Sequence, residues 1–143
     1  MIYIDTREKK NKHIVDYMDR HGVQYEHKKL DVADYCSDGK VLIERKANLL
    51  ELAGNITKEN GRRIKAELER VPPSAQLVFL VEEAIGGLDD VPKWKSERTK
   101  LLGTTMHRYL VSWQKKHGIV FIFCSKRSSG RIICQLLGGE KEC

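Results

Sequence analysis

The stretch Asp31–Lys46, DVADYCSDGKVLIERK, contains the pattern that decides the fold. At its centre, Asp38-Gly39 is a strong hairpin-turn signal. The segment that follows, Lys40–Lys46, has the apolar and β-branched residues of a strand. The stretch therefore predicts two neighbouring strands joined by a tight turn, with several charged residues on the second strand.

Side chains alternate between the two faces of a strand, so Glu44 and Lys46 point the same way while Arg45 points the other way. Asp34 lies ten positions before Glu44, on the opposite arm of the hairpin. The turn can bring it beside Glu44. One face of the hairpin is therefore expected to carry two carboxylates and an ammonium group.

The rest of the chain shows strand and helix signals in alternation. Strands are predicted at Ile2–Ile4, Val23–Leu30, Gln76–Val81 and Ile119–Phe123, and helices within Asn11–Gly22, Asn48–Asn55, Arg62–Val71, Leu102–Gly118 and Ser128–Leu137. The near-continuous apolar runs of the last two strands are typical of strands buried on both faces. The alternation predicts one α/β domain over residues 1–143, with three layers and a mixed central sheet flanked by helices.

Hydrolysis of a phosphodiester needs groups that offset negative charge, because the phosphate repels hydroxide and the transition state adds charge to its oxygens. Asp34 and Glu44 offer the hard oxygen ligands that Mg²⁺ or Mn²⁺ prefer. Such a metal ion lowers the pKa of an attacking water, and Lys46 can hold that water or stabilise the developing charge. The pattern predicts a metal-dependent hydrolytic site, although ExK alone also occurs as a surface ion pair.

Two ordered motifs resemble those of the XPF (xeroderma pigmentosum group F) nuclease family. The ERK triplet at 44–46, ten residues after Asp34, resembles the family signature GDxxxERKxxxD, and Ile4–Glu8 (IDTRE) resembles its opening (V/I)DxRE strand. Leu52–Arg62 and the run QLVFLVEE resemble later parts of the family, so the resemblance covers nearly the entire chain. It implies a restriction-endonuclease-like PD-(D/E)xK fold and cleavage of flapped, forked or branched DNA in repair, recombination or replication.

The sequence departs from the family pattern at two positions. Ala33 replaces the glycine of GD, which restricts the backbone but removes no ligand. Leu50 stands where the signature has its last acidic residue, and Glu51 follows it. Since Asn48 and Glu51 also have the spacing of a helix capping box, Glu51 either caps a helix or belongs to the site.

Five further residues near the expected site have open roles. The resemblance implies catalytic roles for Asp5 and Glu8, while a solvated turn is the alternative. Arg7 either pairs with them or grips phosphate. Arg45, a further catalytic candidate, is expected to contact DNA or to support the site from the opposite face of the strand, and an exposed strand arginine is the alternative. Glu82 either ends its strand as a structural carboxylate or joins the site.

Positive charge is concentrated in the last third of a chain whose formal net charge is +6. No Asp or Glu occurs from Arg98 to Gly139, whereas eight Lys and Arg residues lie there. Such a segment either faces a polyanion beside an acidic metal site or is a solvated basic face. The residues expected to contact DNA are Arg7, Arg62, Lys115, Lys116, Lys126 and Arg127.

Composition argues against several other classes of protein. No apolar stretch approaches the ~18–20 residues that span a bilayer, and MIYIDTREKK lacks the apolar segment of a signal peptide. We therefore expect a cytoplasmic, nucleoid-associated or nuclear protein that is not secreted. The four cysteines form no CxxC pair and the five histidines have no ligand spacing, which argues against a zinc site and favours surface positions for the histidines.

The combined prediction is a Mg²⁺- or Mn²⁺-dependent endonuclease of the XPF type that lacks helix-hairpin-helix modules in this chain. Its selectivity for DNA junctions then comes from the domain itself, from a homodimer or from a partner protein. Two alternatives are a non-cleaving DNA-binding or scaffolding module and a Holliday-junction resolvase of the same fold. Retention of Asp34, Glu44 and Lys46 together argues against the non-cleaving alternative.

Overall fold

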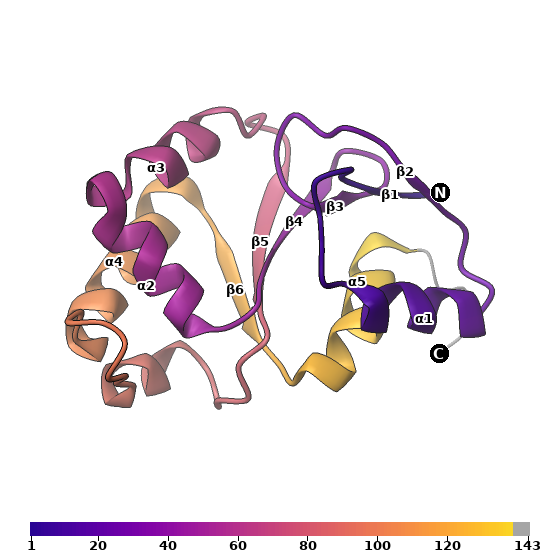
Figure 1. Ribbon diagram of the computed structural model, residues 1–143. Coiled ribbons are helices and arrows are strands. Elements are labelled where there is room, and N and C mark those ends of the chain that lie inside the picture. Colours follow the sequence, from indigo (N-terminus) through magenta and orange to yellow (C-terminus); the bar gives the residue numbers. More distant parts are fainter. Residues whose placement is uncertain (139–143) are drawn as a thin grey trace.

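Two helical layers enclose a six-stranded sheet in the computed structural model, which describes residues 1–138 without the side chains of Glu59 and Asn60 (Figure 1). The strands are β1 (Ile2–Ile4), β2 (Tyr25–His27), β3 (Tyr35–Cys36), β4 (Val41–Lys46), β5 (Gln76–Val81) and β6 (Val120–Phe123). Their order is β2-β1-β3-β4-β5-β6. Only the pairs made by β3 are antiparallel among the described strands, so the sheet is mixed, as predicted. The end of the predicted domain, residues 139–143, lies outside the described residues.

The helices divide between the two faces of the sheet. They are α1 (Lys12–Arg20), α2 (Leu49–Thr57), α3 (Arg62–Glu69), α4 (Gly103–His117) and α5 (Ser129–Leu137), with the short 3-10 helices η1 (Lys58–Gly61), η2 (Leu88–Lys93) and η3 (Lys126–Ser128). In Figure 1, α2, α3 and α4 lie on the left of the strands, and α1 and α5 on the right. The predicted three-layer α/β fold is therefore confirmed. Within residues 1–138, each helix is too short or too polar to cross a membrane.

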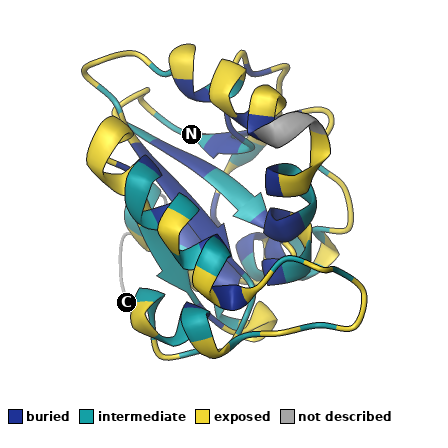
Figure 2. Cartoon of the chain, turned by 90° about the vertical axis from the view of Figure 1, so that its left-hand side faces the viewer, coloured by how far each residue is buried: buried dark blue, intermediate teal, exposed yellow. Residues whose placement is uncertain are grey.

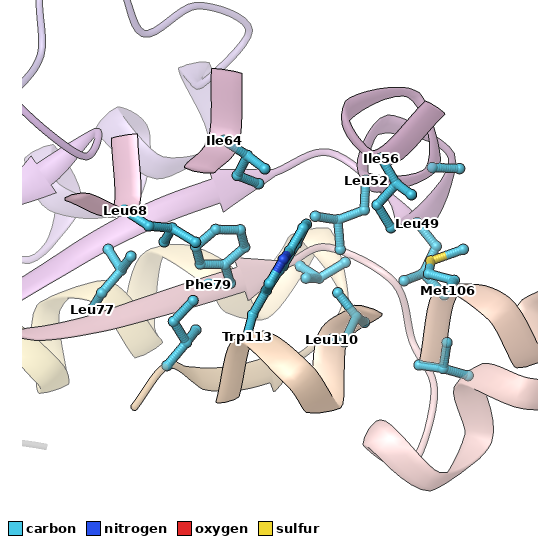
Figure 3. Packing of buried hydrophobic residues seen from close by; sticks show 14 of the residues in the cluster. Leu49, Leu52, Ile56, Ile64, Leu68, Leu77, Phe79, Met106, Leu110 and Trp113 are labelled. Carbon is cyan, nitrogen blue, oxygen red and sulfur yellow. The ribbon is translucent and has the colours of Figure 1, made fainter. Parts of the chain in front are cut away.

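The central strands are buried because both of their faces are covered. Along β5, Leu77, Phe79 and Val81 belong to the core under α2–α4, whereas Val78 and Leu80 belong to the core under α1 and α5. Figure 3 shows the first core, in which Phe79 lies among side chains from all three helices. Figure 2 shows the same arrangement as buried strands between helices with exposed outer surfaces. As predicted, the apolar run of β5 is continuous because both faces of this strand are buried.

The alternation of β5 continues in β4 and decides where its charged residues point. Leu42 packs in the core under α2–α4, and Ile43 packs in the core under α1 and α5. By the same alternation, Glu44 and Lys46 lie on the side of α2 and α3, and Arg45 lies on the side of α1 and α5. The two cores therefore divide the charged residues of this strand between two environments.

Three expectations about the elements are wrong in detail. The strand predicted at Ile119–Phe123 is not buried on both faces: β6 pairs only with β5 among the described strands, and as an edge strand it leaves Val120 40% exposed. Only Tyr25–His27 of the predicted Val23–Leu30 strand is extended, at the other edge. Leu102 precedes α4 and is exposed, because its helix begins one residue later.

Candidate active site

The hairpin of β3 and β4 holds Asp34 in place through its backbone and its carboxylate. The Asp34 N–H donates to the carbonyl of Ile43 at 2.8 Å, and its carbonyl accepts from the Asp5 N–H at 2.8 Å. Its Oδ2 accepts from the Arg45 N–H, also at 2.8 Å. The preceding Ala33 has φ 72°, a left-handed conformation that favours glycine, which explains why the family signature has glycine there. Asp34 is therefore fixed beside β4.

Glu44 and Lys46 lie side by side on one face of β4, as predicted from strand alternation. The Lys46 Nζ is 3.3 Å from Glu44 Oε2, and their side chains are 9% and 12% exposed. The Lys46 ammonium also lies 6.0 Å from the centre of the Phe79 ring. One ammonium group is thus held against apolar core beside a nearly buried carboxylate.

Asp34 and Glu44 line a cleft of about 230 Å³ between the hairpin and α3. The lining residues are Asp5, Arg7, Asp31, Val32, Ala33, Asp34, Glu44, Glu67 and Arg70. Glu67 is a member that sequence reasoning missed, and its carboxyl group adds to the effect of burial in raising the pKa of Glu44. Glu67 lies three residues after the buried Ile64 and one before the buried Leu68. The helical periodicity of α3 could therefore have placed it near the buried face of the helix.

The cleft concentrates negative charge away from water. Burial, with Glu8 and other carboxylates nearby, raises the pKa of Asp34 to about 7, although the Arg45 N–H and Lys46 act against this shift. Burial and the Asp34 carboxylate also hold the pKa of Glu44 well above its ordinary value. The nearby Lys46 charge therefore does not suffice to stabilise both carboxylates in their ionised form.

Asp5 also lines the cleft, but its carboxylate oxygens already have partners. Arg7 Nε donates to Asp5 Oδ2 at 2.8 Å, and the Leu30 N–H donates to Asp5 Oδ1 at 2.8 Å. These hydrogen bonds outweigh burial and hold the pKa of Asp5 below its ordinary value. Arg7 also donates to the Leu30 carbonyl at 2.7 Å. The pair thus fastens the loop before Asp34 to the end of β1.

The opposite face of β4 carries a closed ion-pair network centred on Arg45. Its Nε lies 2.7 Å from Glu8 Oε2 and its Nη1 lies 2.5 Å from Glu82 Oε1. The side chains of Arg45, Glu8 and Glu82 are 7%, 8% and 3% exposed. Of the roles left open for Arg45, these contacts favour support of the site from the opposite face of β4. Glu8 and Glu82 are its ion-pair partners there. This face leaves little room for a ligand.

Two residues that sequence reasoning passed over complete this network. The Glu82 Oε2 accepts from Ser129 Oγ at 2.6 Å and lies 2.6 Å from His13 Nε2. The expectation that all histidines lie at the surface is therefore wrong for His13, because α1 packs against α5 over the end of β5. The approach is close at Gly130, where an added Cβ would lie 2.7 Å from the Tyr17 Cβ. Glu82 thereby links the sheet to both helices of its layer.

The remaining site candidates lie outside the cleft. Glu51 belongs to the capping box of α2: the N-cap Asn48 accepts at Oδ1 from the Glu51 N–H at 2.9 Å, and Glu51 Oε1 accepts from the Ala47 N–H at 3.4 Å. Among the exposed cations, Arg62 begins α3. Lys115 and Lys116 end α4 before β6, whereas Lys126 and Arg127 lie in η3 after it. The two basic pairs therefore flank β6, one before it and one after it in the sequence.

The described residues contain no group of three or more His, Cys, Asp or Glu side chains arranged to hold a metal ion. Two carboxylates in an open cleft nevertheless suit Mg²⁺, which proteins commonly bind through one or two carboxylates plus waters and substrate phosphate. The donor set of Asp34 and Glu44 therefore fits a hard cation that keeps part of its hydration shell.

Solved structures with this fold are found among XPF proteins. XPF from Aeropyrum pernix matches with a TM-score of 0.74 and 18% identity over 96% of this chain and 59% of that chain. XPF from Aeropyrum pernix in complex with DNA matches with a TM-score of 0.73 and 19% identity over 96% of this chain and 62% of that chain. This chain thus spans less than two thirds of either XPF chain, and identity this low demonstrates a shared fold alone.

A comparison of sequences extends this result from fold to family. No curated protein matches the chain. Residues 4–136 match the ERCC4 domain, and this range includes the β3–β4 hairpin, the cleft and the Arg45 network. Because that match spans nearly the whole sequence, this chain belongs to the ERCC4 domain family.

Proposed function

We propose that this chain is a Mg²⁺- or Mn²⁺-dependent DNA endonuclease whose active site is the cleft of Asp34, Glu44 and Lys46. The observation that carries the proposal is the placement of these three residues by one hairpin, with two half-buried carboxylates lining one cleft and one ammonium group beside Glu44. Membership of the ERCC4 domain family and likeness to an XPF structure with DNA support it.

Asp34 and Glu44 would hold the metal ion. Bound there, the ion would supply a Lewis acid for the phosphate oxygens and a lower pKa for an attacking water. The excess of carboxylates over ammonium groups favours a cation, because burial makes uncompensated negative charge costly. Glu67 lines the same cleft, adds to the effect of burial in raising the pKa of Glu44 and adds to the negative charge of the cleft.

Lys46 acts on the reacting groups as a compact point charge. Its ammonium lies 3.3 Å from Glu44, which lines the cleft, and it can orient a water or stabilise a phosphate oxygen as charge develops. Arg45 and Glu8, proposed from sequence as catalytic, act instead as positioning residues behind the strand. Asp5 positions the loop that carries Asp34.

The proposed substrate is branched DNA, such as flaps, forks or junctions, cut in repair or recombination. This part of the proposal rests on the resemblance of the ERK and IDTRE motifs to the XPF signature. Selectivity for junctions is proposed to come from the domain itself, a second copy of the chain or a partner protein. Salt-dependent binding is expected for any of these arrangements, because DNA phosphates dominate the affinity.

A panel of linear, flapped, forked and four-way DNA, incubated with Mg²⁺, Mn²⁺ or EDTA, tests the proposal. We expect cleavage of branched substrates with either metal and none with EDTA. Binding to branched DNA without cleavage in either metal would favour the non-cleaving alternative. Symmetric cleavage of four-way DNA alone would favour the resolvase alternative.

A further inference from the structure

A second hollow adjoins the acidic cleft. Its volume is about 410 Å³, and it is lined by Arg7, Lys29, Leu30, Asp31 and Arg70. Arg7, Asp31 and Arg70 line the acidic cleft as well, so the two hollows are direct neighbours. The proposed endonuclease mechanism uses the cleft and leaves this basic neighbour without a role.

The balance of charge reverses between the two hollows. Five carboxylates and two guanidinium groups line the acidic cleft, whereas three cationic side chains and one carboxylate line its neighbour. Arg7 and Arg70 lie at the boundary, since they belong to both. A polyanion that reaches the cleft is therefore attracted to the adjoining basic hollow, where its charge is offset.

Backbone contacts hold the two guanidinium groups over the loop that leads to Asp34. Arg7 Nη2 donates to the Leu30 carbonyl at 2.7 Å, and Arg70 Nε donates to the Asp31 carbonyl at 3.4 Å. Carbonyl groups carry no net charge, so Arg70 keeps its positive charge for a ligand. Asp5 offsets part of the Arg7 charge, which leaves Arg70 and the exposed Lys29 as the stronger attractants.

The chemistry of the lining points to phosphate as the ligand. Arginine presents paired N–H donors that match phosphate oxygens, and lysine adds a mobile point charge. Of the described residues, no aromatic side chain lines the hollow, so it offers no surface on which a base could stack. Contacts of this kind position a nucleic acid without reading its sequence.

We infer that the basic hollow binds a DNA phosphate next to the one that is cut, through Lys29, Arg70 and the outer edge of Arg7. The inference rests on the proposed function, because the cleaved phosphate is taken to lie in the acidic cleft. Lys29 and Arg70 then make part of the DNA contact beside the catalytic cleft. Neither residue is among those that the sequence predicts to contact DNA. The bound strand thus leaves the cleft across the loop between β2 and β3.

The test compares how steeply the affinity for labelled flap DNA falls with salt, measured by fluorescence anisotropy in Ca²⁺ without turnover. The double variant Lys29→Gln/Arg70→Gln removes both charges, and Lys29→Arg/Arg70→Lys preserves them. Lys93→Gln/Lys95→Gln is the matched control, since these exposed lysines line neither hollow. Arg7 is left unchanged because it also holds Asp5.

We expect the neutralised variant to bind more weakly, with a slope of log affinity against log salt shallower by about 1, as expected when one phosphate is no longer neutralised. The charge-preserving variant and the control should keep the wild-type slope. An unchanged slope in the neutralised variant, or an equal loss in the control, would overturn the inference, as would a wild-type protein that binds no DNA. Wild-type binding without cleavage in Mg²⁺ or Mn²⁺ would contradict the endonuclease proposal alone, because the slopes are measured without turnover.

Discussion

The two faces of β4 carry charged clusters of opposite design. On the side of α2 and α3, Asp34 and Glu44 line an open cleft in which burial raises the pKa of both carboxyl groups. On the side of α1 and α5, Arg45 lies between the carboxylates of Glu8 and Glu82, and these three side chains are less than a tenth exposed. There, hydrogen bonds from Ser129 and His13, together with Arg45, overcome burial and hold the pKa of Glu82 below its ordinary value.

This difference distinguishes carboxylates that can still gain from a bound cation from charged groups that already have partners. A closed network, in which each charge has a partner within hydrogen-bonding distance, gains nothing from a further ion. The open cleft has more carboxylates than cations nearby and therefore gains from a bound cation. Adjacent residues in one ERK triplet thus have different surroundings because strand alternation sends them to opposite layers.

The largest effect is expected from removing a carboxylate of the cleft. Asp34→Asn and Glu44→Gln keep the volume of each side chain but remove the charge that would hold the metal ion, so kcat should fall by orders of magnitude. Mn²⁺ should raise the unfolding midpoint of the wild type and much less that of either variant, since only binding to the folded state stabilises it. Thermal unfolding with and without Mn²⁺ provides this second measurement. A folded variant that cuts at the wild-type rate would show that the site is assigned wrongly.

Lys46→Ala should separate catalysis from DNA binding. Interactions made mainly in the transition state change kcat, so this variant should bind flap DNA in Ca²⁺ about as well as the wild type and cut it much more slowly in Mg²⁺. Lys46→Arg should rescue poorly, because a planar guanidinium does not replace a compact ammonium packed between Glu44 and Phe79. Single-turnover rates at saturating protein measure the chemical step. Weakened binding with an unchanged rate would assign Lys46 to DNA contact instead.

On the closed face, the expected effect is on stability. Glu82→Gln removes one charge from a buried network and leaves Arg45 incompletely compensated, which should lower the free energy of unfolding by about 3–5 kcal/mol. The matched control Glu69→Gln changes an exposed carboxylate and should stay within about 0.5 kcal/mol of the wild type. Urea unfolding measures both. Equal destabilisation by the two variants would mean that the network contributes no special stability.

Coupling between Arg45 and Glu82 can be measured with a further pair of variants. Each single variant breaks the Arg45–Glu82 ion pair, and the double variant Arg45→Gln/Glu82→Gln breaks it only once, so its loss should be smaller than the sum of the two single losses. Additive losses would indicate that Arg45 and Glu82 act independently.

Local pattern accounts for the part of the site that the sequence predicts. A turn signal and strand alternation suffice to place Asp34, Glu44 and Lys46 together, because all three belong to one hairpin. Glu67 escapes prediction because its contact with Glu44 depends on how α3 packs beside β4, which no local rule specifies.

The closed network is harder still to predict, since Glu82, His13 and Ser129 come from three distant segments. Similarly, the apolar run of β6 resembles that of β5, although one is an edge strand and the other has neighbours on both sides. Hydrophobicity indicates that a segment is a strand, whereas its position in the sheet depends on the whole topology.

The smallest expected effect is an opposite pH dependence of stability on the two faces. The folded pKa of Asp34, about 7, lies above its ordinary value of 3.8, so the contribution of this group to stability is lost as the pH rises through 7 in EDTA. The folded pKa of Glu82 is lowered, so its contribution is present at neutral pH and is lost on acidification below its ordinary value of 4.5.

Each group contributes a slope of at most about 1.4 kcal/mol per pH unit. Urea unfolding in EDTA should show Asp34→Asn flattening the curve between pH about 4 and 7, where the wild type binds protons on folding, and Glu82→Gln flattening it only at acidic pH below about 4.5. Mg²⁺ should reduce the neutral-range slope of the wild type by favouring the ionised carboxylates, and should leave the acidic-range slope unchanged. Loss of the neutral-range slope in Glu82→Gln, with retention in Asp34→Asn, would reverse the assignment of the two faces.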